Sequence, residues 1–384
     1  MLTGMRYSHV IAGFIAVLVG YAGSAAIIFQ ASAAAGATPA QASSWMLALG
    51  LGCAISSVYL SLRHKIPVLT AWSTPGAALL VVALPGTSLE QAVGAFVFCG
   101  VLLWLTGVTG WFEKLSALIP DALANAMLAG VLFKFGIGIF TSIQMSPVFV
   151  AIMGLTYVLA RRWAARFAIP LVLLVGLTFA VGTGAFQGLA NIPLTLAKPV
   201  FVMPEANLSV LIGVGLPLYL VTMSSQNMAG VAVLRGAGYR PPISSALSVT
   251  GGLTAILAPF GGFAFNLAAI TAAICAGEEA GADKAKRYWA PVVSGVMYLL
   301  LGLFGTTVVG FFLAAPEVFV ATLAGLALLP VIAASLSAAL EGSATREAAL
   351  VTFLTTVSGI SFFGVAAPVW ALLFGGAVWV LSRR

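Results

Sequence analysis

A polar run interrupts an apolar stretch at residues 222–230, TMSSQNMAG. Ser225, Gln226 and Asn227 offer neutral hydrogen-bond donors and acceptors, which are costly in apolar surroundings unless they find partners. We therefore expect these side chains to face a cavity that receives a polar ligand. The alternative is a structural role, because polar side chains also join neighbouring helices by hydrogen bonds.

A second group of polar residues lies in residues 66–84, where the helical pattern is broken. The first part, IPVLTAW, is typical of extended chain, and Ser73 or Thr74 is suited to cap a helix that follows. Pro75 fits the first helical position, where a missing N–H costs nothing. Gly76 would let a ligand approach the backbone closely. The sequence therefore predicts an extended segment followed by a half-helix.

Residues 259–277, PFGGFAFNLAAITAAICAG, show the same pattern later in the chain. Prolines and glycines precede Asn266, which we expect to cap a helix extending to Cys275. A helix of that length rises about 15 Å, half of a hydrocarbon core of roughly 30 Å. Such a helix would begin in mid-membrane, where its free N–H groups and positive dipole end form an anion site. The alternative for either broken segment is a short loop with an ordinary kinked helix.

Charged residues are scarce inside the apolar runs. Asp121 and Glu317 follow Pro120 and Pro316 at the start of two apolar runs, where a carboxylate stabilises a helix N-terminus. Capping is therefore the favoured interpretation of both. Lys134 is the one basic residue deep in an apolar run, and it is either functional or extended towards the membrane surface.

The composition is that of a helical membrane protein. Of 384 residues, 61% are hydrophobic and 7% are charged, and the mean hydropathy is +1.12. Apolar runs of about 20 residues recur along the chain, which predicts an all-α polytopic membrane protein. The net charge of +7 comes from basic residues scattered between apolar runs, so we expect no nucleic-acid partner. We also expect no metal, no cofactor and no catalytic residue, because no enzyme or metal motif occurs.

Hydropathy and helix-breaking residues predict fourteen membrane segments. The first seven are 9–31, 42–62, the broken 66–84, 90–109, 121–140, 147–161 and 168–186; the second seven are 208–226, 243–258, the broken 259–277, 288–311, 317–339, 347–362 and 365–381.

The distribution of basic residues supports this count. With a cytoplasmic N-terminus, the cytoplasmic segments hold Arg6, Arg63, Lys65, Lys114, Arg161, Arg162, Arg166, Arg235, Arg240, Lys284, Lys286, Arg287, Arg346, Arg383 and Arg384, whereas Lys198 lies on the other side. Positively charged residues collect in cytoplasmic loops of inner-membrane proteins. The pattern predicts a multi-pass plasma-membrane protein with both termini in the cytoplasm.

The two broken segments occupy corresponding places in an internal repeat. Residues 72–130 and 264–325 share one layout: a short helix, a charged loop, a long apolar run, and a Pro-acid-apolar run that ends in LAG. Because each repeat holds an odd number of crossings, the second must be inverted relative to the first, as in secondary transporters. We expect one inverted repeat in residues 1–190 and the other in residues 205–384.

Four phrases identify a resemblance to a known family. TAWSTPGAALL (70–80), ANAMLAGVLFKFG (124–136), SQNMAGVAVLR (225–235) and APFGGFAFNLAAITAAICAG (258–277) resemble the benzoate transporter family, BenE. The layout is more distantly similar to the uracil and xanthine permeases. The resemblance implies a core domain of spans 1–4 and 8–11, a gate domain of spans 5–7 and 12–14, and strands before half-helices 3 and 10. It also implies proton-coupled import of benzoate across the inner membrane.

The chain departs from the permeases at two positions. Their typical glutamates in span 8 and before half-helix 10 correspond to Gln226 and Phe265 here. Two buried carboxylates would repel an anion, whereas an amide and two helix N-termini would attract one. Our hypothesis places an aromatic carboxylate between the half-helices, with Phe265 packed on its ring. The candidate substrate-binding residues are Tyr21, Ser24, Ser73, Thr74, Gly76, Ser225, Gln226, Asn227, Phe265 and Asn266.

Other functions remain open at this point. Asp121, Glu317 and the substrate carboxyl are equal candidates to carry the coupled proton. A transporter of another small anion or of a nucleobase would share the fold. A passive channel or scaffold is disfavoured, because helix breaks in a bilayer are costly unless they line a cavity. The resemblance also allows a homodimer.

Overall fold

The computed structural model describes residues 5–112, 120–186, 192, 194–362 and 365–382. The chain is mostly helical, because a backbone in lipid must pair its N–H and C=O groups within its own segment. The helices of the first half are α1 (Tyr7–Ala34), α2 (Pro39–His64), α3 (Thr74–Ala83), α4 (Leu89–Thr109), α6 (Asp121–Thr141), α7 (Pro147–Trp163) and α8 (Ala168–Gly182), with the short η1 (Ser142–Gln144) and η2 (Ala165–Phe167).

The second half begins with a single helical rod over residues 208–236 that contains two π-helical segments. The rod comprises α9 (Leu208–Val210), the π-helix η4 (Leu211–Gly215), α10 (Leu216–Val221), the π-helix η5 (Thr222–Asn227) and α11 (Met228–Gly236). The later elements are α12 (Ile243–Leu257), η6 (Ala258–Phe260), α13 (Ile270–Ala276), η7 (Glu278–Ala280), η8 (Lys284–Lys286), α14 (Trp289–Leu303), α15 (Gly305–Ala314), α16 (Glu317–Leu340), α17 (Arg346–Ser358) and α18 (Ala367–Leu381).

Two short strands occupy the predicted extended stretches. β1 (Thr70–Trp72) pairs antiparallel with β2 (Phe265–Leu267), in the register Thr70 to Leu267, Ala71 to Asn266 and Trp72 to Phe265. A separate hairpin joins β3 (Ser361–Phe362) to β4 (Val365–Ala366). The prediction of extended chain before half-helices 3 and 10 is therefore confirmed.

The start of the second half-helix was predicted wrongly. Asn266 lies in β2, and α13 begins at Ile270 without a side-chain cap. The reason is pairing across the two halves: Leu267, the residue after Asn266, is held opposite Thr70 in extended conformation, so it cannot be the first residue of a helix. For the first half-helix, the predicted cap at Ser73 is confirmed, but α3 starts at Thr74, so Pro75 is its second residue and not the first as predicted.

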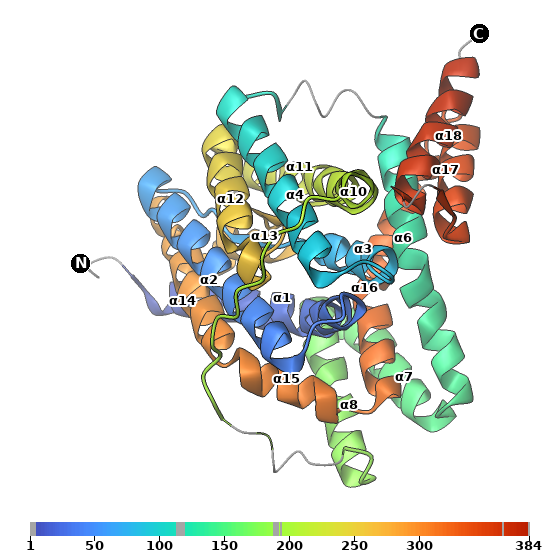
Figure 1. Cartoon of the computed structure of the whole chain (residues 1–384). Coiled ribbons are helices and arrows are strands. Elements are labelled where there is room, and N and C mark those ends of the chain that lie inside the picture. The colour runs from blue at the N-terminus through green and yellow to red at the C-terminus, as the bar shows by residue number, and fades with distance from the viewer. Residues whose placement is uncertain (1–4, 113–119, 187–191, 193, 363–364, 383–384) are drawn as a thin grey trace.

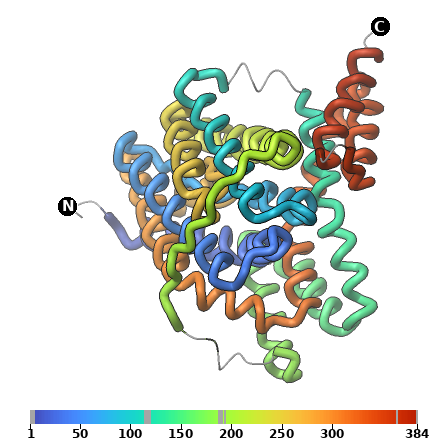
Figure 2. The backbone as a smooth tube through the Cα atoms, viewed as in Figure 1, coloured from blue at the N-terminus to red at the C-terminus, as the bar shows by residue number. Residues whose placement is uncertain are grey.

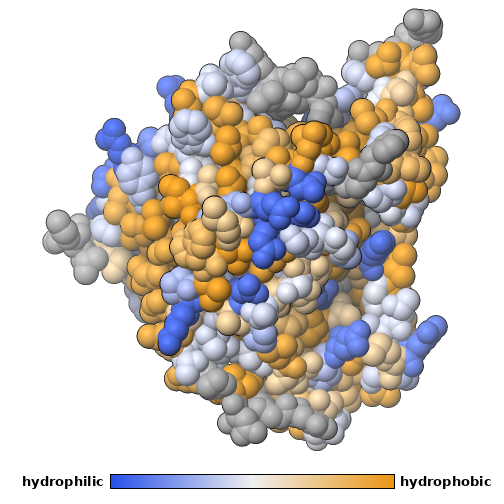
Figure 3. Space-filling view, in the orientation of Figure 1, coloured by the Kyte–Doolittle hydropathy of each residue, from blue (hydrophilic) through white to orange (hydrophobic). Residues whose placement is uncertain are grey.

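The structure is that of a multi-pass membrane protein. Within the described ranges, eight helices are long and apolar enough to cross a membrane. A ninth crossing results if the segment from Lys284 to Leu303 and α15, which meet at a bend of 63°, form one span. The face shown in Figure 3 is largely hydrophobic, with hydrophilic residues in separate patches. Fourteen crossings and the inverted repeat remain predictions.

The helices form two groups with α1 and α3 between them (Figure 1). In one group α4 packs on α12 and α2 packs on α14; in the other, α6 packs on α16 and α17, and α17 packs on α18. Close approach of α4 and α12 depends on Gly107, because a Cβ there would lie within 2.3 Å of the backbone nitrogen of Ser248.

An extended connection links the two halves. Residues 194–207 cross the front of the first helix group before α9 begins (Figure 2). The connection is held by successive hydrogen bonds: Ala197 N donates to Leu303 O, Val200 N to Ser44 Oγ, Val202 N to Pro259 O, and Glu205 N to Glu90 O. Residues 187–191 and 193, near the boundary predicted at 190, lie outside the described residues.

Candidate functional site

The paired strands are held in the protein interior by side chains from several helices. The Leu267 N–H donates to Asn227 Oδ1 of η5 (3.0 Å), and the Phe265 N–H donates to Thr254 Oγ1 of α12 (3.0 Å). The Ser73 N–H donates to Ala264 O (3.0 Å). Asn227 is therefore already engaged in positioning β2, a strand and not a neighbouring helix.

A serine stripe on α2 anchors the other strand. Thr70 Oγ1 lies 2.6 Å from Ser56 Oγ and 2.7 Å from Ser57 Oγ, and Ser61 Oγ donates to Val68 O. All these hydroxyls are buried. This stripe was not predicted from the sequence, although its spacing of one and four residues within an apolar helix was a signal.

The strand pair also joins α1 through Trp72. Its indole N–H donates to Ser24 Oγ (2.9 Å), and its ring packs edge-on against Tyr21 at a centroid distance of 5.7 Å. Tyr298 of α14 contacts the same indole at 5.3 Å. The predicted residues Tyr21 and Ser24 are thus brought to the strand pair, but Ser24 is occupied by Trp72.

The N-terminus of α3 offers few donors to an anion. Ser73 Oγ accepts the Gly76 N–H (3.0 Å), Ser73 O accepts the Ala77 N–H (2.7 Å), and Pro75 has no N–H. Among the described residues, this leaves the Thr74 N–H as the donor of that turn open to a ligand. Gly76 is not a point of ligand approach, because Leu218 of α10 lies against it and would meet an added Cβ.

The polar run falls on the π-helix η5. The Ser225 hydroxyl donates to Val221 O (2.6 Å), so it is satisfied within its own helix. Gln226 is half-buried and has no side-chain hydrogen bond in the part of the chain that is described. π-helical segments often occur at functional sites, and η5 packs on β2, α3 and α6.

Phe265 does not lie where the hypothesis placed it. Its ring is fully buried against α2, where a Cβ on Gly52 would overlap the ring atoms. In a strand, successive side chains point to opposite faces, so Asn266 projects to the other side of β2 from Phe265. A ring contact between Phe265 and a substrate beside Asn266 is therefore not supported.

Four buried oxygens have no hydrogen-bond partner within the described part of the chain. They are Tyr21 Oη, Thr222 Oγ1, Asn266 Oδ1 and Thr322 Oγ1. Buried polar atoms are satisfied in the great majority of cases, so unpaired ones require an explanation such as a ligand. Thr222 begins η5, and Thr322 lies on α16, which packs on α1 and α6. Neither threonine was predicted as a site residue, because a single threonine in an apolar run is common.

The charged candidates lie at the surface. Asp121 and Glu317 are exposed first residues of α6 and α16, which are the positions that favour a capping role. Lys134 is exposed on α6, and its Nζ lies 3.7 Å from where a Cβ on Gly359 would stand. Gly359 ends α17, and a cation there interacts favourably with the helix dipole.

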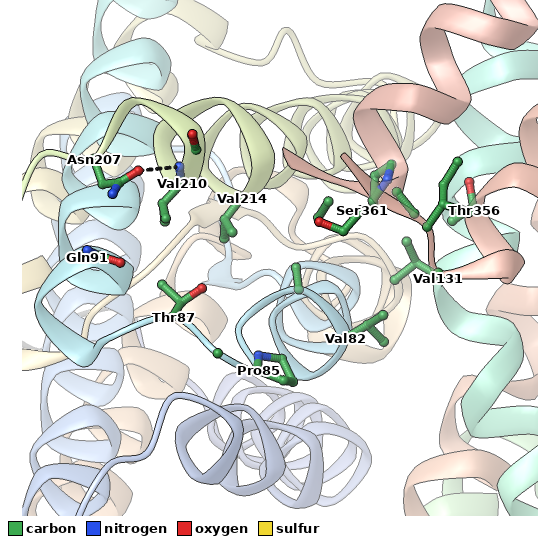
Figure 4. Close-up of a pocket in the computed structure, with 18 residues that line it drawn as sticks. Val82, Pro85, Thr87, Gln91, Val131, Asn207, Val210, Val214, Thr356 and Ser361 are labelled. Carbon is green, nitrogen blue, oxygen red and sulfur yellow. Dashed lines mark hydrogen bonds between the residues drawn. The ribbon is translucent and has the colours of Figure 1, made fainter. Parts of the chain in front are cut away.

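A cavity of about 500 Å³ opens between the two helix groups (Figure 4). One side is formed by the end of α3, the start of α4 and the start of the 208–236 rod, with Thr87, Gln91 and Asn207 among the polar residues. The other side is formed by Val131 of α6, Thr356 of α17 and the β3–β4 hairpin. Its lining includes no charged residue.

Sequence comparisons identify relatives over nearly the whole chain. Residues 3–381 match the model of the BenE family, described as benzoate membrane transport protein. The chain is 43% identical to inner membrane protein YdcO of Escherichia coli over 371 residues, covering 97% of this chain and 95% of that protein. It is 40% identical to the benzoate membrane transport protein of Acinetobacter baylyi over 372 residues, covering 96% of this chain and 93% of that protein.

Solved structures of low sequence identity share the fold. SLC26A9 superposes with a TM-score of 0.66 at 12% sequence identity. The match covers 100% of this chain and 66% of that one. Murine Slc26a9, an anion transporter in the inward-facing state, superposes with a TM-score of 0.63 at 12% sequence identity. The match covers 100% of this chain and 68% of that one. The transmembrane domain of the cyanobacterial bicarbonate transporter BicA superposes with a TM-score of 0.58 at 11% sequence identity. The match covers 96% of this chain and 97% of that one. At these identities the likeness concerns the fold alone.

Proposed function

Because the chain belongs to the BenE benzoate membrane transport family, we propose that it imports benzoate or a similar aromatic carboxylate across the inner membrane together with protons. The single observation that carries the site is the meeting of the two broken segments. β1 and β2, from opposite halves of the chain, pair deep in the protein, where Asn266 of β2, Tyr21 beside Trp72 and Thr222 of η5 each have a buried oxygen that lacks a partner in the described part of the chain. A small polar ligand bound there would satisfy those oxygens.

The helix packing supports the inverted repeat. Exchanging the halves converts the α4–α12 contact into the α14–α2 contact, and the α7–α8 contact into the α17–α18 contact. The strand register is also symmetric, because the exchange maps Thr70 paired with Leu267 onto Phe265 paired with Trp72. Equivalent strands related by an axis along the membrane normal would run parallel, so their antiparallel pairing favours an axis in the membrane plane.

This symmetry supports fourteen crossings in two inverted sevens, with residues 1–190 and 205–384 as the repeats. Each predicted segment contains a helix or a strand with a half-helix. The core domain then comprises spans 1–4 and 8–11, and the gate domain spans 5–7 and 12–14. The cavity in Figure 4 lies between core and gate residues, as expected if the two domains move against each other for alternating access.

The basic loops favour cytoplasmic termini, as the positive-inside rule requires. Of the residues that carry this argument, Lys114, Arg383 and Arg384 lie outside the described part of the chain. A homodimer paired through gate domains is a further proposal, resting on the resemblance to the permeases.

The proposed site differs from the one expected from sequence. In our proposal Tyr21, Thr74, Thr222, Gln226 and Asn266 contact the substrate, whereas Ser24, Ser73, Ser225, Asn227 and Phe265 support the site through contacts within the protein.

Uptake of labelled benzoate by proteoliposomes tests this function. We expect saturable uptake driven by an inward proton gradient, competed by unlabelled benzoate and not by uracil or sulfate. Counterflow of preloaded benzoate distinguishes a carrier from a passive channel. Gln226→Ala, Thr222→Val and Asn266→Ala should each reduce uptake at least about tenfold, since each removes a hydrogen bond in a buried site. Wild-type rates in all three correctly inserted variants would refute the site, and competition by uracil or sulfate would point to the alternative substrates.

A further inference from the structure

We propose that the substrate binds as the protonated acid, so that its own carboxyl group carries the coupled proton. This inference rests on the proposed function and identifies the proton carrier that the function leaves open. In the proposed step, benzoate takes one proton from the outer water as it binds. The acid O–H donates to Asn266 Oδ1, and the same proton leaves with benzoate on the inner side.

The orientation of the Asn266 amide carries the argument. Asn266 is completely buried, and its Nδ2 donates to Ala264 O at 2.9 Å. Turning the amide around would place Oδ1 against that carbonyl oxygen, which is repulsive. The atom left without a partner is therefore Oδ1, which can only accept a hydrogen bond. An ionised carboxylate offers acceptors alone, whereas a carboxylic acid offers one donor.

The other unpaired groups are compatible with the acid. Tyr21, which packs on Trp72, and Thr222 of η5, which packs on β2, carry unpaired hydroxyls that can donate to the carbonyl oxygen of the acid. Asn266 is fully buried, so a ligand reaches it only after a movement that opens a path to the strand pair; in this proposal, separation of the core and gate domains provides that path. That separation is already part of the alternating-access proposal.

No buried cation is placed to neutralise a carboxylate. In the described part of the chain, the buried side chains that can carry positive charge are His9 and Arg287, both at helix ends. His9 Nδ1 accepts the Arg6 N–H, and Arg287 donates to Ala276 O at the end of α13 and to Gly281 O. Burying an ionised carboxylate without a cation is very unfavourable. Protonating a carboxyl with a pKa near 4.3 costs only about 500-fold in affinity at pH 7.

No protein carboxyl is placed to carry the proton instead. Every Asp and Glu that the structure describes is at least partly exposed. The elements packed on β2 are β1, η5, α2, α11 and α12, and their titratable or charged groups are Cys53, Tyr59, Arg63, His64 and Arg235. Tyr21 and Tyr298 approach through Trp72. Among these, Cys53, Tyr21 and Tyr298 lie near the strand pair, and thiols and phenols are ordinarily neutral at pH 6 to 8.

Displacement of labelled benzoate from purified protein in detergent, at pH 6 and pH 8, tests the proposal. Binding coupled to one proton weakens about tenfold per pH unit, so benzoate should bind about 100-fold more weakly at pH 8. Benzamide, a neutral N–H donor of the same shape, should compete equally at both pH values. Benzenesulfonate, an anion that stays ionised, should compete at neither. These three results need no variant.

The outcomes separate the proposal from the function on which it rests. A flat pH profile for benzoate, with competition by benzenesulfonate, would overturn the protonated-acid proposal and leave benzoate transport standing. Absence of benzoate binding at both pH values would overturn both. Asn266→Ala should weaken benzamide and benzoate binding at pH 6 by at least about tenfold. Asn125→Ala, whose amide bonds within the described residues to Asp121 O of its own helix alone, should change neither the affinities nor the pH dependence.

Discussion

Neighbouring residues of the 222–230 run serve different purposes. Asn227 Oδ1 holds the backbone of β2, whereas the Ser225 hydroxyl bonds to a carbonyl of its own helix. Gln226 lies between them without a side-chain partner in the described part of the chain. From residue type and sequence spacing alone, all three residues were predicted to belong to one polar cluster. Which of them faces a ligand depends on where the second broken segment passes.

We expect Asn227→Ala to lower the stability of the protein by about 1–3 kcal/mol, because it leaves the buried Leu267 N–H without an acceptor. Ser225→Ala is the matched control, since it removes a hydroxyl whose one bond in the described part of the chain is to Val221 O, and its cost should stay below about 1 kcal/mol. Apparent melting temperatures of both variants in detergent, without substrate, measure the difference. Equal shifts would contradict the role assigned to Asn227.

At the scale of elements, the strand pair depends on close approach to α2. Phe265 fills the space above Gly52, while the serine stripe of α2 bonds to β1. Both broken segments are therefore fastened to one long helix. The half-helices continue from this rigid support, which keeps the polar residues at their starts in a fixed position.

Gly52→Ala should destabilise the protein by roughly 1–3 kcal/mol, because the added methyl group would overlap the buried Phe265 ring. Gly154→Ala in α7 provides the comparison: nothing lies within 4 Å of the added Cβ there. That change should be neutral or stabilise the helix by up to about 1 kcal/mol. Thermal unfolding in detergent compares the two, and a Gly52→Ala variant as stable as wild type would disprove the close packing.

On the scale of the whole molecule, the two proposed domains are joined at the end opposite the cavity. The cavity lies at the start of α4, whereas Arg166 of η2 pairs with Glu279 of η7 beyond the end of α13. Lys284, in the same loop as Glu279, donates to Gly238 O after α11, which confirms that this loop lies at the far end of the 208–236 rod. The ion pair thus connects gate to core where the cavity is absent.

Breaking this ion pair should favour separation of the domains at that end. Both side chains are about half exposed, so the pair contributes about 0.2–1 kcal/mol, or up to fivefold in the conformational equilibrium. Arg166→Glu and Glu279→Arg should each change the benzoate counterflow rate by up to about fivefold, and the double exchange should restore it. Additive effects in the double variant would show that the two residues do not interact.

The sequence by itself determined the membrane class, the position of nearly every helix and the two broken segments. These features depend on local properties: the length of apolar runs, the requirement for internal hydrogen bonding in lipid, and the residues that break helices. The Ser73 cap of α3 was also predictable, because its partner, the Gly76 N–H, lies three residues away. Family membership followed from phrases that are contiguous in the chain.

Only the tertiary structure decided how the polar residues are used. Asn266 became part of a strand because β1 lies opposite it, although the two strands are almost 200 residues apart. The same pairing turned Phe265 towards α2 and engaged Asn227 with the backbone. It also left a buried acceptor, Asn266 Oδ1, without a partner in the described part of the chain, where the sequence had suggested donors for an anion. Hydrogen bonds are short-ranged and each atom has few of them, so the available partners depend on which distant segments meet.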